Sequence, residues 1–278
     1  MPGYGIAVRE IERIVVGKWG DPARCEDGIV LTPHFAAVID GATDVTGSVH
    51  DGMTAGRFAM LAVANAIEDL APHTDALAAI DALSRALAAH LSDDMDPGSR
   101  PTASATIYSR ARRELWQVGD VGFWYAGLSQ VPARKLVDVI NMQMRLAMVT
   151  AALLGGASPL EIMREDPGRR VCDPLVRAQG LLANTEDARV GDLAFGALNG
   201  TPVPAALVHS VIVPRDVAEV VIASDGYPAL LPSLEQAEAH LARLLSLDPL
   251  CIHELAGTKA LAANAVSFDD RAYLRLAV

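Results

Sequence analysis

The stretch Ala37-Val-Ile-Asp-Gly-Ala-Thr-Asp44 decides the fold, because it joins a short apolar run to Asp40-Gly41. An apolar run that ends on Asp-Gly predicts a buried strand followed by a turn. The same pattern returns in Val221-Ile-Ala-Ser-Asp-Gly226, where a second apolar run ends beside Asp225. Carboxylates at strand ends can converge on one edge of a sheet, so these two stretches predict an acidic edge.

The segments around these two strands predict grouped strands and grouped helices. Apolar residues follow the helical period over residues 51–70, and a second helix follows, with its N-cap predicted at Thr74-Asp75. After these helices, several strand-like segments follow one another before the next helical segments begin. Such grouping of strands and of helices predicts an α+β layered domain instead of alternating βαβ units. The predicted strands cover 102–108, 114–118, 123–125, 206–213, 218–223 and 272–278, and the later helices cover 233–247 and 249–263.

The middle of the chain changes character to helix. Residues 134–182 have apolar positions at helical spacing, and Gly155-Gly156 indicates a stop within them. We interpret residues 127–190 as a helical insertion on a single domain that spans residues 1–278.

The bulk composition restricts the class of protein and its partners. Hydrophobic residues make up 51% and charged residues 21% of the 278 residues, which is a globular profile. The net charge of −11 disfavours nucleic acid as a partner. Cys25, Cys172 and Cys251 form no CxxC pair, which suits a reducing compartment. Because no signal pattern or uncharged apolar run of membrane length is present, we expect a cytoplasmic protein without a membrane partner.

Acidic residues next to strand ends are the candidates for chemistry. Asp40, Asp120, Asp225 and Asp269 each lie beside a glycine or another acid, and Glu26-Asp27 precedes a predicted strand near residue 29. Hard oxygen donors of this kind suit Mg²⁺ or Mn²⁺. A single Asp-Gly is usually only a turn, so the signal lies in the ordered set.

That ordered set resembles the metal-dependent protein phosphatases of the type 2C (PPM) family, in a divergent bacterial-type form. The elements run in family order over nearly the whole chain. They are Cys25-Glu-Asp27, Ala37-Val-Ile-Asp-Gly-Ala-Thr-Asp44, Gln117-Val-Gly-Asp120, Val221-Ile-Ala-Ser-Asp-Gly226 and Phe268-Asp-Asp-Arg-Ala-Tyr-Leu274. The resemblance implies a four-layer αββα sandwich of two antiparallel sheets flanked by helices, with the metals at one end.

The resemblance also implies a role for each acidic residue. Asp40 would bridge two Mg²⁺ or Mn²⁺ ions, with the carbonyl of Gly41 on one of them. Asp225 and Asp269 would complete the first ion's ligands, and Glu26 or Asp27 would lie near the second. Asp120, with Asp225, would hold a third and weaker ion, so that the cofactors number two or three.

The implied reaction is hydrolysis of a phosphomonoester by a water that bridges two metal ions. Two divalent ions lower the pKa of such a water and offset the charge of the phosphate. No protein nucleophile is required, and the sequence contains no GxSxG, CxxxxxR or GxxxxGK[ST] motif.

The sequence departs from the family pattern at two roles. Arg24 is the candidate for gripping the phosphate, with Arg13 and Lys18 as alternatives, because none has the usual spacing to the acidic pair. Ala42 stands where some members have a histidine acid, so the candidate proton donors are His50, a metal-bound water or no dedicated group, and a surface histidine is the simpler interpretation of His50.

Three functions follow, in decreasing order of preference. The first is a phosphatase for phosphoserine or phosphothreonine in proteins. The second is a phosphatase for a small phosphomonoester, such as a sugar, a nucleotide or a biosynthetic intermediate, suggested by the altered loop at Thr43-Asp-Val-Thr46 and the insertion at 127–190. The third is a catalytically silent binding protein on the same fold.

Overall fold

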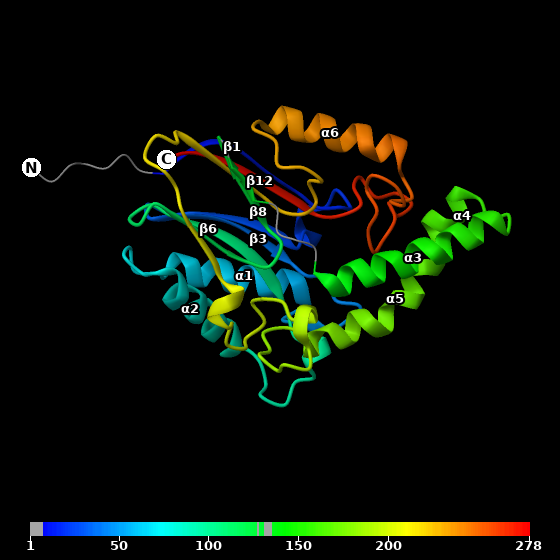
Figure 1. Ribbon diagram of the computed structural model, residues 1–278, viewed down its shortest axis with the longest axis horizontal. Coiled ribbons are helices and arrows are strands. Elements are labelled where there is room, and N and C mark those ends of the chain that lie inside the picture. Colours follow the sequence, from blue (N-terminus) through cyan, green and yellow to red (C-terminus); the bar gives the residue numbers. More distant parts are fainter. Residues whose placement is uncertain (1–7, 127, 131–134) are drawn as a thin grey trace, which may run out of the picture.

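Two five-stranded antiparallel sheets lie face to face in the centre of the molecule (Figure 1). The computed structural model describes residues 8–126, 128–130 and 135–278. The first sheet has the order β1-β12-β11-β8-β9 and the second has the order β10-β7-β6-β3-β2. Their strands are β1 (Arg9–Val16), β2 (Asp27–Leu31), β3 (Phe35–Gly41), β6 (Ala103–Ser109), β7 (Glu114–Val118), β8 (Gly122–Tyr125), β9 (Leu128–Gln130), β10 (His209–Ile212), β11 (Glu219–Ala223) and β12 (Arg271–Ala277). A separate hairpin consists of β4 (Val49–His50) and β5 (Met53–Thr54).

Helices cover the outer face of each sheet. Helices α1 (Ala55–Glu68) and α2 (Ala76–Ala88) lie below the second sheet in Figure 1, and α6 (Leu234–Leu247) lies above the first. Apolar residues fill all three interfaces: one cluster joins α1 and α2 to the second sheet, another joins the two sheets, and a third joins α6 to the first sheet. The predicted four-layer αββα sandwich is therefore confirmed.

Local sequence signals explain where the covering helices begin. Thr54, Asp75 and Ser233 each precede a helix, and each side chain accepts a hydrogen bond from a backbone N–H in the first turn. These caps satisfy donors that the helix itself leaves unpaired. The N-cap predicted at Thr74-Asp75 is confirmed, and Asp75 is the residue that caps.

The predicted insertion contains three helices that extend from one end of the sandwich (Figure 1). They are α3 (Leu136–Leu154), α4 (Pro159–Arg164) and α5 (Pro167–Ala178). Gly155 caps the end of α3, as its sequence predicts. Residues 127 and 131–134, at the start of the predicted insertion, lie outside the described residues.

A buried arginine attaches this insertion to the rest of the molecule. The side chain of Arg145 is fully buried on α3, and its Nε donates to Asp166 at 2.7 Å. Its two terminal nitrogens donate to the backbone carbonyls of Leu250, Cys251 and Gly257. Helix α3 is also the one helix in the described part of the chain with the length and composition of a membrane span, although it carries this charged residue.

The prediction of a helix over residues 249–263 is wrong. The segment is a series of turns and bends, because the carboxylate of Asp248 accepts hydrogen bonds from the backbone N–H groups of Ile252, His253 and Leu255. These bonds, together with the left-handed backbone of Cys251 at φ 50°, hold the segment outside helical geometry. Strand β1 was not predicted, because its exposed charged residues hide the alternation of an edge strand.

Candidate active site

The antiparallel sheets bring seven carboxylates to one edge of the sandwich. Asp120 and Asp225 follow strands β7 and β11, whereas Asp269 and Asp270 precede β12. Asp27 begins β2 and lies opposite Asp40 in the register of β2 and β3. Ends and starts of antiparallel neighbours meet at the same edge, which explains the convergence. We call Glu26, Asp27, Asp40, Asp120, Asp225, Asp269 and Asp270 the acid cluster.

Crowding of negative charge perturbs the acid cluster. Burial raises the pKa of Asp40 well above its usual range, and the neighbouring carboxylates of Asp27 and Asp225 raise it further. Burial and the charge of Asp269 raise the pKa of Asp225 to about 7. Two carboxylates placed in this way repel each other when no cation lies between them.

The pKa of Asp27 is also raised, first by its burial and then by the charges of Asp269 and Asp270. A hydrogen bond of 2.6 Å from the Oγ of Ser224 to its Oδ2 acts in the opposite direction. Together, Asp27, Asp40 and Asp225 form the part of the acid cluster whose negative charge is least compensated by the protein. A cation at this point would relieve the repulsion.

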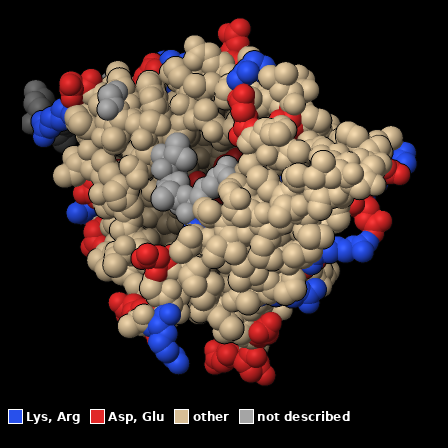
Figure 2. Space-filling model, turned by 45° about the vertical axis from the view of Figure 1, so that its right-hand side comes forward, with Lys and Arg blue, Asp and Glu red and all other residues tan. Residues whose placement is uncertain are grey.

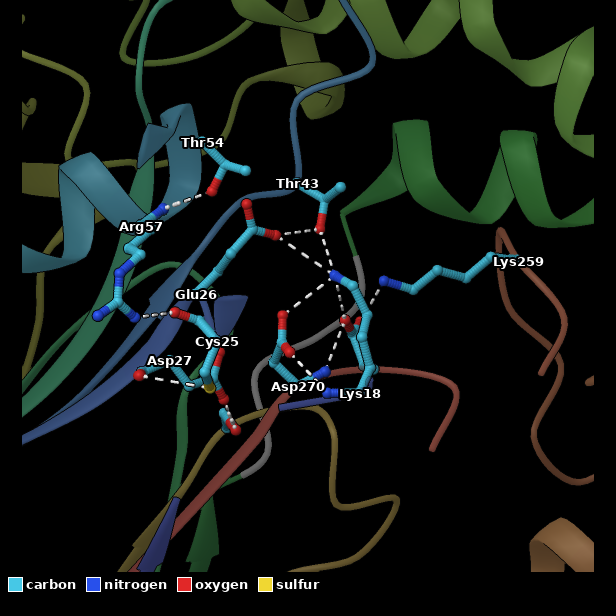
Figure 3. Close-up of polar contacts among 11 residues, drawn as sticks. Lys18, Cys25, Glu26, Asp27, Thr43, Thr54, Arg57, Lys259 and Asp270 are labelled. Carbon is cyan, nitrogen blue, oxygen red and sulfur yellow. Dashed lines mark hydrogen bonds and ion pairs between the residues drawn. The ribbon is translucent and has the colours of Figure 1, made fainter. Parts of the chain in front are cut away.

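Lysine side chains compensate the rest of the acid cluster. The Nζ of Lys18 lies 3.3 Å from Glu26 and 3.0 Å from Asp270, and it donates to the Oγ1 of Thr43 at 2.9 Å (Figure 3). The Nζ of Lys18 is also 3.7 Å from Asp269. An ammonium group has three donors, and these contacts occupy all of them.

Two further lysines approach from other segments. The Nζ of Lys259 lies 2.6 Å from Asp269, on the opposite side of the acid cluster from Glu26 (Figure 3). The Nζ of Lys135, directly before α3, lies 2.8 Å from Asp120. Burial alone would raise the pKa of Asp120, but the charge and hydrogen bond of Lys135 hold it below its ordinary value.

A pair of glycines brings oxygen atoms together beside the acid cluster. A Cβ on Gly56, in the first turn of α1, would lie 2.8 Å from the carbonyl oxygen of Gly41 and 2.9 Å from Oε1 of Glu26. A Cβ on Gly41 would in turn lie 2.2 Å from the carbonyl oxygen of Gly56. Only glycine permits this approach, so the two backbones hold carbonyl and carboxylate oxygens near one point.

Two adjoining pockets open on the acid cluster. The smaller, of about 140 Å³, is lined by Asp40, Asp225 and Asp269 on one side and by Arg169 and Lys259 among its other residues. The larger, of about 270 Å³, shares Asp225 and Lys259 and extends over apolar residues. The face shown in Figure 2 is hollowed near its centre, with acidic atoms visible inside the hollow, and its Lys and Arg residues form no continuous patch.

The described structure does not bring two predicted residues to these pockets. The ring of His50 packs 5.3 Å from that of Phe58 and lines neither pocket. Arg24 is exposed, with its guanidinium 5.3 Å from the ring centre of Trp19. Arg13, an alternative for Arg24, pairs with Glu10 on the outer strand β1. Neither the proton-donor nor the phosphate-gripping prediction gains support from this placement.

Sequence reasoning missed the basic residues of the site. Lys135, Lys259 and Arg169 come from the insertion and from the irregular segment before β12, and no motif marks them. One signal was available: Lys18, Lys135 and Lys259 are the only lysines in the sequence. All three contact the acid cluster.

The fit of the site to divalent cations differs along the acid cluster. Within the part of the chain that the structure describes, no three Asp, Glu, His or Cys side chains form a ready metal-binding group. The pair of Asp40 and Asp225, with the oxygen atoms gathered by Gly41 and Gly56, fits a hard cation, because its carboxyl groups repel each other without one. Asp120 does not fit one as it stands, because its oxygen already holds Lys135.

Comparisons with known proteins give structural likeness at low sequence identity. No family model matches the sequence, and no curated protein matches it. The serine/threonine phosphatase PstP/Ppp of Mycobacterium tuberculosis is similar over 98% of this chain and 99% of its own, with 17% identity and a TM-score of 0.48. The phosphatase Stp1 of Staphylococcus aureus is similar over 100% and 99%, with 12% identity and a TM-score of 0.48. RsbX in complex with magnesium is similar over 97% and 98%, with 13% identity and a TM-score of 0.46.

Proposed function

We propose that this chain is a divalent-metal-dependent phosphatase of the type 2C family, which hydrolyses phosphomonoesters at the acid cluster. One observation carries the proposal: seven carboxylates meet three lysines at one sheet edge, and two of the least compensated, Asp40 and Asp225, border a pocket whose lining also includes cationic side chains. An acidic site of this charge binds cations, and a phosphate ester needs cations beside it.

Asp40 and Asp225 are the residues that would hold a divalent ion in common. Asp269 lies beside them, and the carbonyl of Gly41 and the carboxylate of Glu26 supply further oxygens. When bound, such ions supply a water of lowered pKa and neutralise charge on the phosphoryl group. The carboxylates orient the ions, and the raised pKa of Asp225 supports an exchange of its proton for a cation.

Lys259 and Arg169 are the residues best placed to bind the phosphoryl oxygens. Both line the smaller pocket, and the Nη1 of Arg169 donates to the carbonyl of Thr258 at 3.3 Å, beside Lys259. Lys18 is less suited to this role, because its three donors already bind Thr43 and carboxylates. The phosphate grip therefore comes from the insertion and the segment before β12, instead of from Arg24.

Phosphoserine and phosphothreonine in proteins remain the preferred substrates. A small phosphomonoester is the second candidate, and the larger pocket favours it, because Tyr227, Leu230 and Phe268 offer an apolar enclosure of about 270 Å³ next to Asp225. Parallel assays on phosphopeptides and on a panel of phosphorylated metabolites separate the two. Turnover of phosphopeptides without turnover of any metabolite would exclude the second candidate.

The three cysteines are buried and free, which supports a reducing compartment, and we place the protein in the cytoplasm. No membrane or nucleic-acid partner is part of the proposal.

Hydrolysis of p-nitrophenyl phosphate with EDTA, Mg²⁺ or Mn²⁺ tests the proposed function. We expect activity that requires a divalent ion and falls at least ~100-fold in Asp40→Asn, because the ion would lose a shared carboxylate. Asp81→Asn, on the exposed face of α2, is the matched control and keeps full activity. If no ion supports activity and calorimetry detects no Mn²⁺ binding, the phosphatase proposal is wrong and the silent binding protein remains.

A further inference from the structure

The distribution of lysine in this chain is unusual. Lys18, Lys135 and Lys259 are its only lysines, and every other member of its 23 Lys and Arg residues is an arginine. Lysines normally lie scattered on the surface, where lysine and arginine serve equally well. Here all three lie against the acid cluster, so a requirement of the site selects lysine at these positions.

The three lysines reach the acid cluster from three separate parts of the fold. Lys18 follows β1, Lys135 precedes α3, and Lys259 lies in the irregular segment before β12. Each ammonium group lies within 3.0 Å of a carboxylate oxygen: Asp270, Asp120 and Asp269, respectively. Their side chains are 14%, 22% and 29% exposed, so these ion pairs are partly shielded from solvent.

The chemistry of the ammonium group explains why arginine would not serve. An ammonium is a compact point charge whose three donors turn freely, whereas a guanidinium is a wide planar fork. Among protein side chains, lysine therefore comes closest to a bound metal ion in size and charge distribution. A lysine tip can occupy the space between carboxylates that a metal ion would otherwise occupy.

Lys135 occupies such a space most clearly. Its Nζ binds Asp120 at 2.8 Å and lies 4.0 Å from the carboxylate of Asp138. The ring of Phe195 lies 5.0 Å from the same Nζ and faces its charge. The ammonium is thus held by the carboxylate of Asp120, with that of Asp138 farther off, and by an aromatic ring.

We propose that Lys135 is a built-in cation that takes the place of a divalent ion at Asp120, so that the chain binds two divalent ions instead of three. This inference rests on the proposed metal-dependent phosphatase and assigns its ion count. A divalent ion at Asp120 would approach the carboxylate oxygen that already binds the ammonium group, and the two cations exclude each other by charge and by space. Lys18 and Lys259 pair with Glu26, Asp269 and Asp270, which leaves Asp27, Asp40 and Asp225 as the least compensated carboxylates.

Calorimetric titration with Mn²⁺ tests the proposal directly, with no need for activity. We expect two ions per chain in the wild type and three in Lys135→Met, which keeps the length of the side chain and removes its charge. Arg85→Met, which removes an exposed cation on α2 away from the site, is the matched control and binds two. Adding Asp120→Asn to Lys135→Met removes the third ion again, because the freed carboxylate is its ligand.

Lysine resonances give a second readout that also shows whether the variants are folded. Protein labelled with ¹³C at the ε carbon of lysine contains three labelled side chains, all of them at the site. In the wild type, paramagnetic Mn²⁺ broadens all three signals because it binds nearby. When diamagnetic Mg²⁺ is titrated instead, the chemical shift of the Lys135 signal stays constant, because its ion pair with Asp120 stays closed. In Lys135→Met, the two remaining signals at their wild-type positions establish that the site is intact.

The outcomes separate this inference from the function on which it rests. Three ions in the wild type, or no gain of an ion in folded Lys135→Met, would overturn the inference while metal-dependent hydrolysis stands. Absence of any Mn²⁺ binding in all variants would overturn the proposed function and this inference together. A gain of one ion that Asp120→Asn abolishes establishes Lys135 as the substitute cation.

Discussion

Neutralising Asp225 should stabilise the metal-free protein although it removes a proposed metal ligand. The pKa of this carboxyl is raised from 3.8 to about 7, by burial and by the charge of Asp269. A shift of that size corresponds to at most ~4 kcal/mol, at about 1.36 kcal/mol per pKa unit. More than a third of the residue faces solvent in the pocket, so screening reduces the expected cost to ~1–2 kcal/mol.

The sign of the effect follows from proton linkage. Between the unfolded pKa of 3.8 and the folded pKa of about 7, the native state binds more protons than the unfolded state. The free energy of unfolding therefore falls as the pH rises through this range, and the cost is complete above about pH 7. Asp225→Asn carries no such charge, so its advantage over the wild type should grow from about pH 5 to about pH 8.

Thermal unfolding with EDTA and with Mn²⁺ measures this effect. With EDTA at about pH 8 we expect Asp225→Asn to unfold roughly 2–6 °C above the wild type. With Mn²⁺ the order reverses, because an ion at 100 times its Kd stabilises the native wild type by ~2.7 kcal/mol and the variant by less. Asp81→Asn, which removes an exposed carboxylate on α2, should show neither effect. A variant less stable than the wild type with EDTA, or an advantage that does not change with pH, would refute the reasoning.

Three further predictions test other parts of the site. Gly56→Ala should destabilise the protein by ~1–3 kcal/mol in urea unfolding, because its Cβ would meet oxygens at 2.7–2.9 Å, although alanine usually favours a helix; equal or greater stability would contradict the close packing. Arg169→Ala and Lys259→Met should each raise KM for p-nitrophenyl phosphate ~10-fold and weaken inhibition by inorganic phosphate to a similar degree; unchanged phosphate inhibition in both variants would remove them from the phosphate grip. Arg145→Met should lower stability by ~3–5 kcal/mol, because Asp166 would keep a largely buried charge without its partner, and limited proteolysis should then cut the insertion first; a protease-resistant insertion would argue against this attachment.

The layers of the fold could be predicted from the sequence because they depend on local periodicity. Apolar runs of strand length and the helical spacing over residues 51–70 reflect which faces are buried, and burial is visible in the order of residues. The helix over 249–263 was predicted wrongly because apolar spacing gives no information about side-chain hydrogen bonds. Here three backbone N–H groups donate to the carboxylate of Asp248, and these bonds compete with helix formation.

The sequence by itself determined the fold class and the acidic half of the site, because aspartates at strand ends are tied to elements whose ends must meet. Only the tertiary structure decided which groups face those acids. It brings Lys18, Lys135 and Lys259 to the acid cluster, and Lys18 is 252 residues away in sequence from its partner Asp270. It leaves Arg24 and His50 away from the two pockets. The interaction between two charges depends on their separation in space, and the position of a single lysine in the sequence does not predict that separation.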